Sequence, residues 1–214
     1  MHDISLYVLE LVENSIRAKA GIIAVAVEFD FASDRLRVSV EDDGEGIRVP
    51  AEQVLDPFYT TCDWKRVGLG LSLLKGVAES TGGELKISRS RELGGAAVMA
   101  VLGLSHVDRP PLGDLASTLS TMILTSPDID FRLRMRGPDR SYTFRLSEFV
   151  RRYGLNSEAN VALASAAFQI LRRDLEIWKR IELSSLEKRW KTRERMPPGP
   201  LFTLVQEARQ AGNE

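Results

Sequence analysis

The sequence is poor in the features that would place the protein outside the reducing interior of a cell. Its single cysteine, Cys62, excludes a disulfide within one chain and a zinc site built from cysteines alone. No apolar run reaches the roughly 18 to 20 residues that a membrane-spanning helix needs. Acidic residues stand at the amino terminus, where a signal peptide carries basic ones. We therefore expect a cytoplasmic protein without a membrane segment.

An excess of one charge is also missing. Lysine and arginine number 29 against 30 acidic residues, a formal net charge of −1. The basic excess that is typical of nucleic-acid-binding proteins is absent, so we do not expect a nucleic acid as partner. Hydrophobic residues make up 43% of the 214 residues, enough for a buried core. At roughly 100 to 150 residues per domain, this length predicts two domains.

The first half of the sequence predicts the order helix, two strands, loop, helix, two strands. Apolar residues recur every three or four positions over residues 3–19, as on one face of a helix. The β-branched runs at 22–31 and 35–42 flank a polar turn and predict a hairpin. The next predicted helix opens with LGLSLLKGVAEST, and the segments GELKISRS and GAAVMAVLGL are the last two predicted strands.

Paired prolines after His106 interrupt helix and strand alike. Residues 105–111 are therefore predicted to link a domain at 1–104 to a smaller domain at 112–214. There we expect one helix, strands over DIDFRLRMRG and RSYTFRLSEF, and a helical tract from about Asn156 to Arg195. The tract can form a homodimer or pack back on its own domain. The alternating arginines of the strands are typical of a solvated face.

One motif with chemical potential lies on the first predicted helix. Glu10 and Asn14 are four residues apart, so both side chains project from one helical face. An asparagine amide oxygen can ligate magnesium, and a carboxylate one turn away can take a proton from an attacking hydroxyl or water. Taken alone, such a pair is more often an ordinary solvated face.

A second motif follows a predicted strand. Asp42 stands at its end, and Gly44, Gly46 and Ile47 come directly after. A carboxylate there can accept a hydrogen bond from an exocyclic amine, while the glycines let the main chain approach a flat base. The structural alternative is a plain turn, because Asp-Gly is common turn chemistry.

A third motif, Gly68-Leu69-Gly70-Leu71-Ser72, opens a predicted helix. Glycines bare the backbone amides where the helix carries partial positive charge, which favours phosphate. No Gly-Lys-Ser/Thr follows, so the motif is not a P-loop, and the third glycine of the dinucleotide fingerprint is missing. An ordinary helix cap is the alternative.

The order of these motifs resembles the GHKL superfamily of ATPases and histidine kinases. Glu10-x-x-x-Asn14 is similar to its N box, Asp42-x-Gly44-x-Gly46 to its first glycine box, and Gly68 to Ser72 to its second. Asp56-Pro-Phe-Tyr-Thr-Thr61 resembles the segment ahead of the lid. The resemblance implies an α+β fold of the Bergerat type, a mixed sheet covered by helices on one face, followed by a second, smaller α+β or helical domain.

The resemblance also implies the ligands and the site residues. ATP and Mg²⁺ would be bound, with Asn14 on the metal, Glu10 as general base and Asp42 on the adenine amine. Phe58 and Thr61 would anchor the lid, and Lys65 or Arg66 would supply a positive charge. The full predicted cofactor-binding set is Asn14, Asp42, Gly44, Gly46, Ile47, Phe58, Thr61, Lys65, Arg66, Gly68, Leu69, Gly70 and Leu71.

The sequence departs from the family pattern at several positions. Cys62 stands where a lysine often follows the threonines, and Arg66 replaces the first glycine of the kinase pattern. Arg17 replaces the aspartate of MutL-like sequences. Gly95-Ala96-Ala97 lacks the threonine or serine that supports the adenine site in many relatives, so one polar contact is expected to be missing.

Glutamate rather than asparagine at position 10 resembles the ATP-hydrolysing members and the anti-sigma serine kinases. We expect a slow ATPase that switches a protein partner. The alternatives are a protein kinase acting in trans and a nucleotide sensor without turnover. His2 is the only histidine before the N box, and no helical hairpin fits there, so autophosphorylation on such a hairpin is not expected. The opening HDISLYVLELVENSIRAKAG also resembles stand-alone ATP-binding proteins associated with iron-hydrogenase genes.

Overall fold

The computed structural model describes residues 3–47, 69–154 and 160–190, and the side chains of 69, 160 and 183–190 lie outside that description. In the first half the elements are α1 (Ile4–Arg17), β1 (Ile22–Asp30), β2 (Arg35–Asp42), α3 (Leu69–Ser80), β3 (Glu84–Arg89) and β4 (Ala96–Gly103). In the second half they are α4 (Leu115–Thr125), β5 (Asp130–Arg136), β6 (Ser141–Arg145), α5 (Leu146–Tyr153) and α6 (Asn160–Trp190).

A single six-stranded sheet in the order β3-β4-β2-β1-β5-β6 forms the centre of the molecule. Its neighbouring strands are antiparallel except β1 and β5, which run parallel from Ile22 beside Asp130 to Glu28 beside Arg136. The parallel pair is joined through the intervening strands and helices, as parallel pairing requires a long crossover. The sheet is therefore mixed, as predicted.

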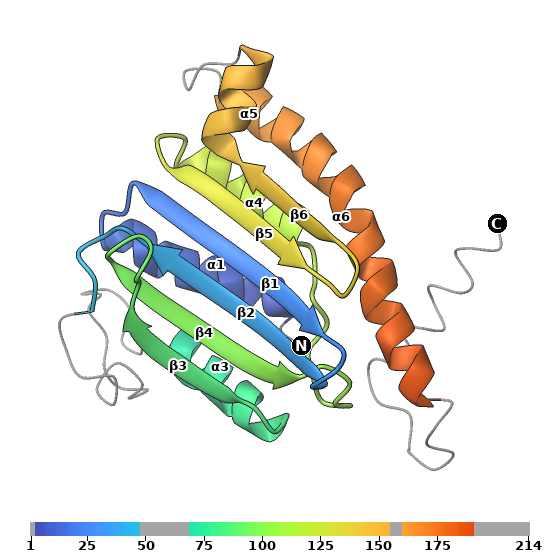
Figure 1. Ribbon diagram of the computed structural model, residues 1–214. Helices are drawn as coiled ribbons and strands as arrows, with labels where there is room; N and C mark the ends of the chain where they lie inside the picture. The colour runs from blue at the N-terminus through green and yellow to red at the C-terminus, as the bar shows by residue number, and fades with distance from the viewer. Residues whose placement is uncertain (1–2, 48–68, 155–159, 191–214) are drawn as a thin grey trace.

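Helices cover one face of this sheet. Alternate residues of β1 and β2 are buried, and they share one core with α1, α3, α4 and α6. Figure 1 shows α1, α3 and α4 behind the strands, and none of the described helices in front of the sheet. The predicted α+β fold with helices on one face is confirmed. None of the helices in the described ranges is both long and apolar enough to cross a membrane.

The two halves of the sequence contribute to the same sheet and the same core. Leu133 of β5 lies beside Val25 of β1, and both are about 1% exposed. Trp178 of α6 is 2% exposed and stacks on Phe29 of β1, with 5.9 Å between ring centroids. The division into domains at residues 105–111 stays a prediction, but the sheet continues across it.

A segment without helix or strand, residues 104–114, connects β4 to α4 and holds both halves together. The main-chain carbonyls of Pro111 and Leu112 accept hydrogen bonds from the N–H groups of Ile4 and Ser5 at the start of α1. The side chain of Arg109 is fully buried and lies 2.7 Å from Glu182 of α6. The same Glu182 carboxylate accepts from the Leu112 N–H at 3.0 Å.

One predicted element is corrected by the structure. The strand expected over RSYTFRLSEF ends at Arg145, and residues 146–153 form α5. Asp130 accepts a hydrogen bond from the Ser147 N–H at 2.9 Å, which satisfies one of the free donors at the helix start. Gly154 closes the helix in the left-handed conformation, with φ of 63°. Helical spacing of Leu146 and Phe149 buries both side chains.

Candidate functional site

Helix α1 presents Glu10 and Asn14 on one exposed face, as predicted from their spacing. The helix begins at its N-cap Asp3, whose side chain accepts from the Leu6 N–H at 3.0 Å. The amide oxygen of Asn14 accepts a hydrogen bond from Arg17 Nη2 at 2.9 Å. The pKa of Tyr7, one turn before Glu10, is raised mainly by burial and also by the negative charge of Glu10. Asn14, the residue predicted to hold the metal, is thus exposed on the helix surface, with its amide oxygen bonded to Arg17.

Asp42, at the end of β2, is a buried carboxylate held by neutral donors. It is 3% exposed. One oxygen accepts from the N–H groups of Gly44 and Ala96, each at 3.0 Å, and the other accepts from the Ser15 hydroxyl at 2.6 Å. A carboxylate has about four acceptor positions, and these contacts use three. The remaining one can accept from an amine of a ligand.

Glycines keep the main chain close to Asp42. A Cβ at Gly95 would lie 2.3 Å from Asp42 Oδ1, and one at Gly44 would lie 2.6 Å from the Ala18 carbonyl oxygen. Gly46 has φ of +71°, a conformation that side chains other than glycine rarely adopt. The turn after β2 is therefore specific to glycine for steric reasons.

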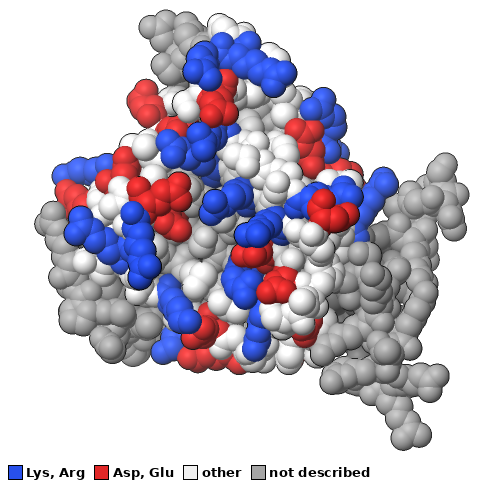
Figure 2. Space-filling view, in the orientation of Figure 1, with Lys and Arg blue, Asp and Glu red and all other residues white. Residues whose placement is uncertain are grey.

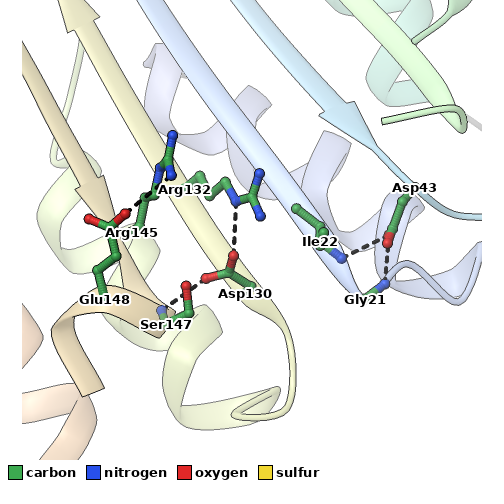
Figure 3. Close-up of polar contacts among 8 residues, drawn as sticks. All are labelled: Gly21, Ile22, Asp43, Asp130, Arg132, Arg145, Ser147 and Glu148. Carbon is green, nitrogen blue, oxygen red and sulfur yellow. Dashed lines mark hydrogen bonds and ion pairs between the residues drawn. The ribbon is translucent and has the colours of Figure 1, made fainter. Parts of the chain in front are cut away.

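The neighbouring Asp43 is a structural residue. Its carboxylate accepts from the N–H groups of Gly21 and Ile22 at 2.7 and 2.8 Å (Figure 3). These contacts tie the turn after β2 to the start of β1. Asp43 thus supports the position of Asp42 without being free to contact a ligand through that oxygen.

The start of α3 lies against Glu10. A Cβ at Gly70 would be 1.9 Å from Glu10 Oε2, so a larger residue there would require this carboxylate to move. Two motifs that are far apart in the sequence are thereby brought together. The helix start, where N–H groups have no acceptor within the helix and partial positive charge gathers, lies beside the candidate general base.

The remaining predicted residues have different outcomes. Leu71 is half-buried and packs on the core, and Ile47 is exposed at 38%. Leu69 begins α3. The predicted residues that lie outside the described part are Phe58, Thr61, Lys65, Arg66 and Gly68. Their roles stay predictions.

The structure adds three contributors that the motif analysis did not assign. Ser15 donates to Asp42 across 27 residues of sequence, and Gly95 and the Ala96 N–H complete the surroundings of the carboxylate. The hydroxyl contact expected to be missing at Gly95 to Ala97 stays a prediction, and the donor observed there is the Ala96 main-chain N–H. Ser15 directly follows Asn14, which is the only sequence signal that pointed to it.

Comparison with known proteins identifies the family that the first half of the chain resembles. Residues 2–106 match the family model described as "Histidine kinase-, DNA gyrase B-, and HSP90-like ATPase". The sensor protein TdiS of Thauera aromatica is 29% identical over 99 residues, which are 43% of this chain and 18% of that protein. The chain thus spans less than a fifth of the length of this relative.

Solved structures with partial similarity include three proteins. The N-terminal domain of a DNA repair protein is 16% identical, with a TM-score of 0.43 over 68% of this chain and 52% of that one. The mycobacterial sensor histidine kinase MprB is 24% identical, with a TM-score of 0.36 over 45% of this chain and 66% of that one. The Aquifex aeolicus MutL ATPase domain complexed with ADP is 17% identical, with a TM-score of 0.41 over 79% of this chain and 70% of that one.

The family match and the motif geometry concern the same part of the chain. Glu10, Asn14, Asp42 and Gly70 all lie within the matched residues 2–106. That part of the chain belongs to the histidine kinase-, DNA gyrase B- and HSP90-like (GHKL) ATPase family.

Proposed function

We propose that this chain binds Mg-ATP between α1, the turn after β2 and the start of α3, and hydrolyses it slowly as a regulatory switch for a protein partner. The observation that carries the proposal is the surroundings of Asp42, a buried carboxylate with three neutral donors and one acceptor position left. Adenine carries an exocyclic amine at C6 that such an acceptor can bind, whereas guanine carries a carbonyl oxygen at that position.

The residues fit Mg-ATP at both ends of the nucleotide. Beside Asp42, Gly44 and Gly95 leave the main chain bare, as the close approach of a flat base requires. At the phosphate end, the N–H groups and partial positive charge of the α3 start favour anions. Asn14 would offer one oxygen ligand to Mg²⁺, which usually completes its shell with phosphates and water. When bound, the ion neutralises phosphate charge.

In this proposal the protein groups divide the chemistry between them. The Glu10 carboxylate accepts the proton of an attacking water, since it is exposed and adjoins Gly70 at the helix start. The α3 main-chain amides donate to phosphate oxygens. Ser15 holds the Asp42 carboxylate in the orientation that meets the base. Turnover and release of the nucleotide would then change how the partner is bound.

The test incubates the full chain with magnesium and γ-labelled ATP and follows free phosphate and protein-bound label together. Glu10→Ala is expected to bind nucleotide and release phosphate at a rate reduced at least about a hundredfold, the effect of losing a general base. Glu79→Ala is the matched control, because Glu79 is an exposed glutamate on α3 that pairs with Lys75. It should leave both binding and turnover unchanged.

The outcomes separate the candidate activities. Phosphate release that depends on Glu10, with no label on protein, supports the ATPase switch. Label that stays on the chain or moves to an added protein would make it a kinase. Binding without either signal would leave a nucleotide sensor, and normal turnover in Glu10→Ala would remove Glu10 from the chemistry.

A further inference from the structure

We propose that the uncovered face of β5 and β6 docks an acidic, extended peptide segment of a partner protein, which adds as a strand to the free edge of β6. This inference is independent of the nucleotide site. It rests on the charge of the β5–β6 hairpin, on the pairing of its arginines and on the position of β6 at the border of the sheet. We call this surface, formed by Arg132, Arg134, Arg136, Thr143 and Arg145, the arginine face.

The alternation of β5 separates its arginines from its core residues. Phe131, Leu133 and Met135 are buried toward the helices, so Arg132, Arg134 and Arg136 project from the uncovered face. On a strand, alternate side chains repeat about every 6.8 Å. Arg145 of β6 lies directly opposite Arg132, and Thr143 lies opposite Arg134. Four guanidinium groups thus share one small area.

The hairpin is basic in a chain that is not. Residues 130–145 contain five arginines and two aspartates, a formal charge of +3, while the whole chain carries −1. Figure 2 views this face and shows basic side chains over β5, β6 and α5. Such local asymmetry favours association with an acidic surface.

The arginines differ in how far they are neutralised. Arg132 is 2.8 Å from Asp130, and Arg145 is 3.1 Å from Glu148 (Figure 3). Arg136 lies 3.8 Å from Glu28. For Arg134, no hydrogen bond or ion pair is found among the residues that the structure describes, and its cross-strand neighbours are the small residues Ala26 and Thr143. Arg134 is therefore an exposed cation with no carboxylate beside it among the described residues, and a carboxylate of a bound peptide could pair with it.

The edge of the sheet offers the second half of the interaction. Within the described part of the chain β6 pairs with β5 alone, so the main-chain donors and acceptors on its other side have no strand partner there. Its sequence SYTFR contains neither the proline nor the lysine with which natural proteins block an edge. The opposite edge, β3, carries an ion pair between Lys86 and Glu84. β6 is thus the edge that is chemically open to strand addition.

The inner side of β6 is firmly held, which makes the strand a rigid template. Phe144 is 7% exposed and contacts Phe149 of α5, with 5.6 Å between ring centroids. An added strand would lie about 4.8 Å from β6 and about 10 Å from β5. A glutamate on its outer face and the extended side chain of Arg134 together span that distance, and Arg145 is nearer still.

A protein segment fits the arginine face better than a nucleic acid does. Carboxylates at Glu28, Asp130 and Glu148 stand between the arginines. They would repel a continuous phosphate backbone, whose binding depends on successive phosphate contacts. Spaced carboxylates on a peptide can instead meet individual guanidinium groups in bidentate pairs.

The test measures fluorescence anisotropy of the full chain with three labelled probes. These are a peptide of about nine residues that alternates glutamate and threonine, the same peptide with glutamine for glutamate, and a single-stranded DNA oligonucleotide of matching charge. The glutamate peptide should bind at least about tenfold more tightly than the glutamine peptide, and added salt should weaken it. Arg134→Glu should reduce its affinity at least about tenfold.

Lys86→Glu is the matched control. Lys86 lies in the same cross-strand row as Arg134 and on the same face, but at the opposite edge of the sheet. It should leave peptide affinity unchanged. Because Arg134 is exposed, Arg134→Glu should keep the fold, with stability changed by at most about 0.5 kcal/mol in urea unfolding.

Hydrogen exchange separates edge addition from simple charge attraction. Bound peptide should slow exchange of amides in residues 141–145, while those of 84–89 in β3 stay unchanged. Three results would overturn the proposal: no binding of the glutamate peptide, equal affinity for the Arg134→Glu variant, or tighter binding of the oligonucleotide than of the peptide. Binding without added protection in β6 would overturn the strand addition.

Discussion

Two buried carboxylates, Asp42 and Glu182, lie in the two halves of the molecule and are stabilised in different ways. Asp42 is 3% exposed, and its donors among the described residues are neutral, the Ser15 hydroxyl and two main-chain amides. Glu182 is 7% exposed and lies 2.7 Å from the buried guanidinium of Arg109. A buried charge with a cation nearby holds the structure together, whereas one with neutral donors and an open acceptor position is suited to a ligand.

The difference has a counterpart in what each carboxylate connects. Asp42 gathers α1, the turn after β2 and the start of β4 around the proposed base pocket. Glu182 gathers α6 and residues 109–112, which in turn accept from the start of α1. Both carboxylates therefore help to position α1. Asp42 binds its carboxyl-terminal half through Ser15, and Glu182 holds the segment that binds its first turn.

Removing the cation beside Glu182 should have the largest effect on the stability of the protein. Arg109→Met should cost about 3–5 kcal/mol of unfolding free energy, because it leaves an uncompensated buried charge. The double variant Arg109→Met with Glu182→Leu should recover most of that loss. Urea unfolding of the three proteins measures both effects, and a single-variant cost below about 1 kcal/mol would show that Glu182 is not held by Arg109.

Removing the acceptor at Asp42 should affect the ligand and spare the fold. In Asp42→Asn the remaining oxygen can keep the two main-chain donors, and the new amide group can donate to the Ser15 hydroxyl. The amide no longer accepts from an exocyclic amine, so we expect ATP affinity to fall at least about a hundredfold, or about 2.7 kcal/mol. Calorimetric titration with ATP, beside an unfolding curve, tests this. Unchanged affinity would exclude Asp42 from the base pocket.

A pair of glycine substitutions on α3 sharpens the same distinction. Gly76→Ala meets nothing within 4 Å and should stabilise the helix by up to about 1 kcal/mol without altering nucleotide turnover. Gly70→Ala gains similar helix propensity but displaces the Glu10 carboxylate, so turnover should fall at least about tenfold. Unfolding curves and phosphate release measure the two effects. Equal turnover in both variants would contradict the contact between Gly70 and Glu10.

The smallest expected effect is a pH dependence at the β1–β2 turn. Hydrogen bonds from the Ser33 side chain and main chain, then from Arg37, lower the pKa of Asp30 from 3.8 to about 2. Since the folded pKa is depressed, this contribution to stability is present above about pH 4 and is lost as pH falls toward 2. Asp30→Asn should flatten that part of the stability curve. If the free energy of unfolding, measured with urea, changed with pH between 4 and 2 in the variant as it does in the unaltered protein, this prediction would be wrong.

Local features of the fold followed from the sequence where local chemistry decides them. The three- and four-residue spacing of apolar residues predicted α1, and the alternation around residues 22–42 predicted the β1–β2 hairpin. The start of α5 was missed. The YTFRL pattern is as compatible with strand as with helix, and the cap at Ser147 comes from Asp130 on another strand.

The candidate site divides in the same way. Glu10, Asn14, Asp42 and the glycines were recognised from short motifs, because each motif lies within one turn or one helix face. The contact of Gly70 with Glu10 joins residues 60 positions apart and could only be expected through the resemblance. Ser15 carried no signal of its own, since a serine on a helix face is ordinary until the end of β2 is brought beside it.

By itself, the sequence determined α1, the β1–β2 hairpin and the short motifs that resemble those of the GHKL family, because these depend on neighbours a few residues apart. Only the tertiary structure decided that β5 pairs with β1, that the Ser15 hydroxyl donates to Asp42 and that Arg109 donates to Glu182. The last pair is separated by 73 residues. Such contacts depend on how elements pack in space, and burial makes their charges costly unless the packing supplies the partner.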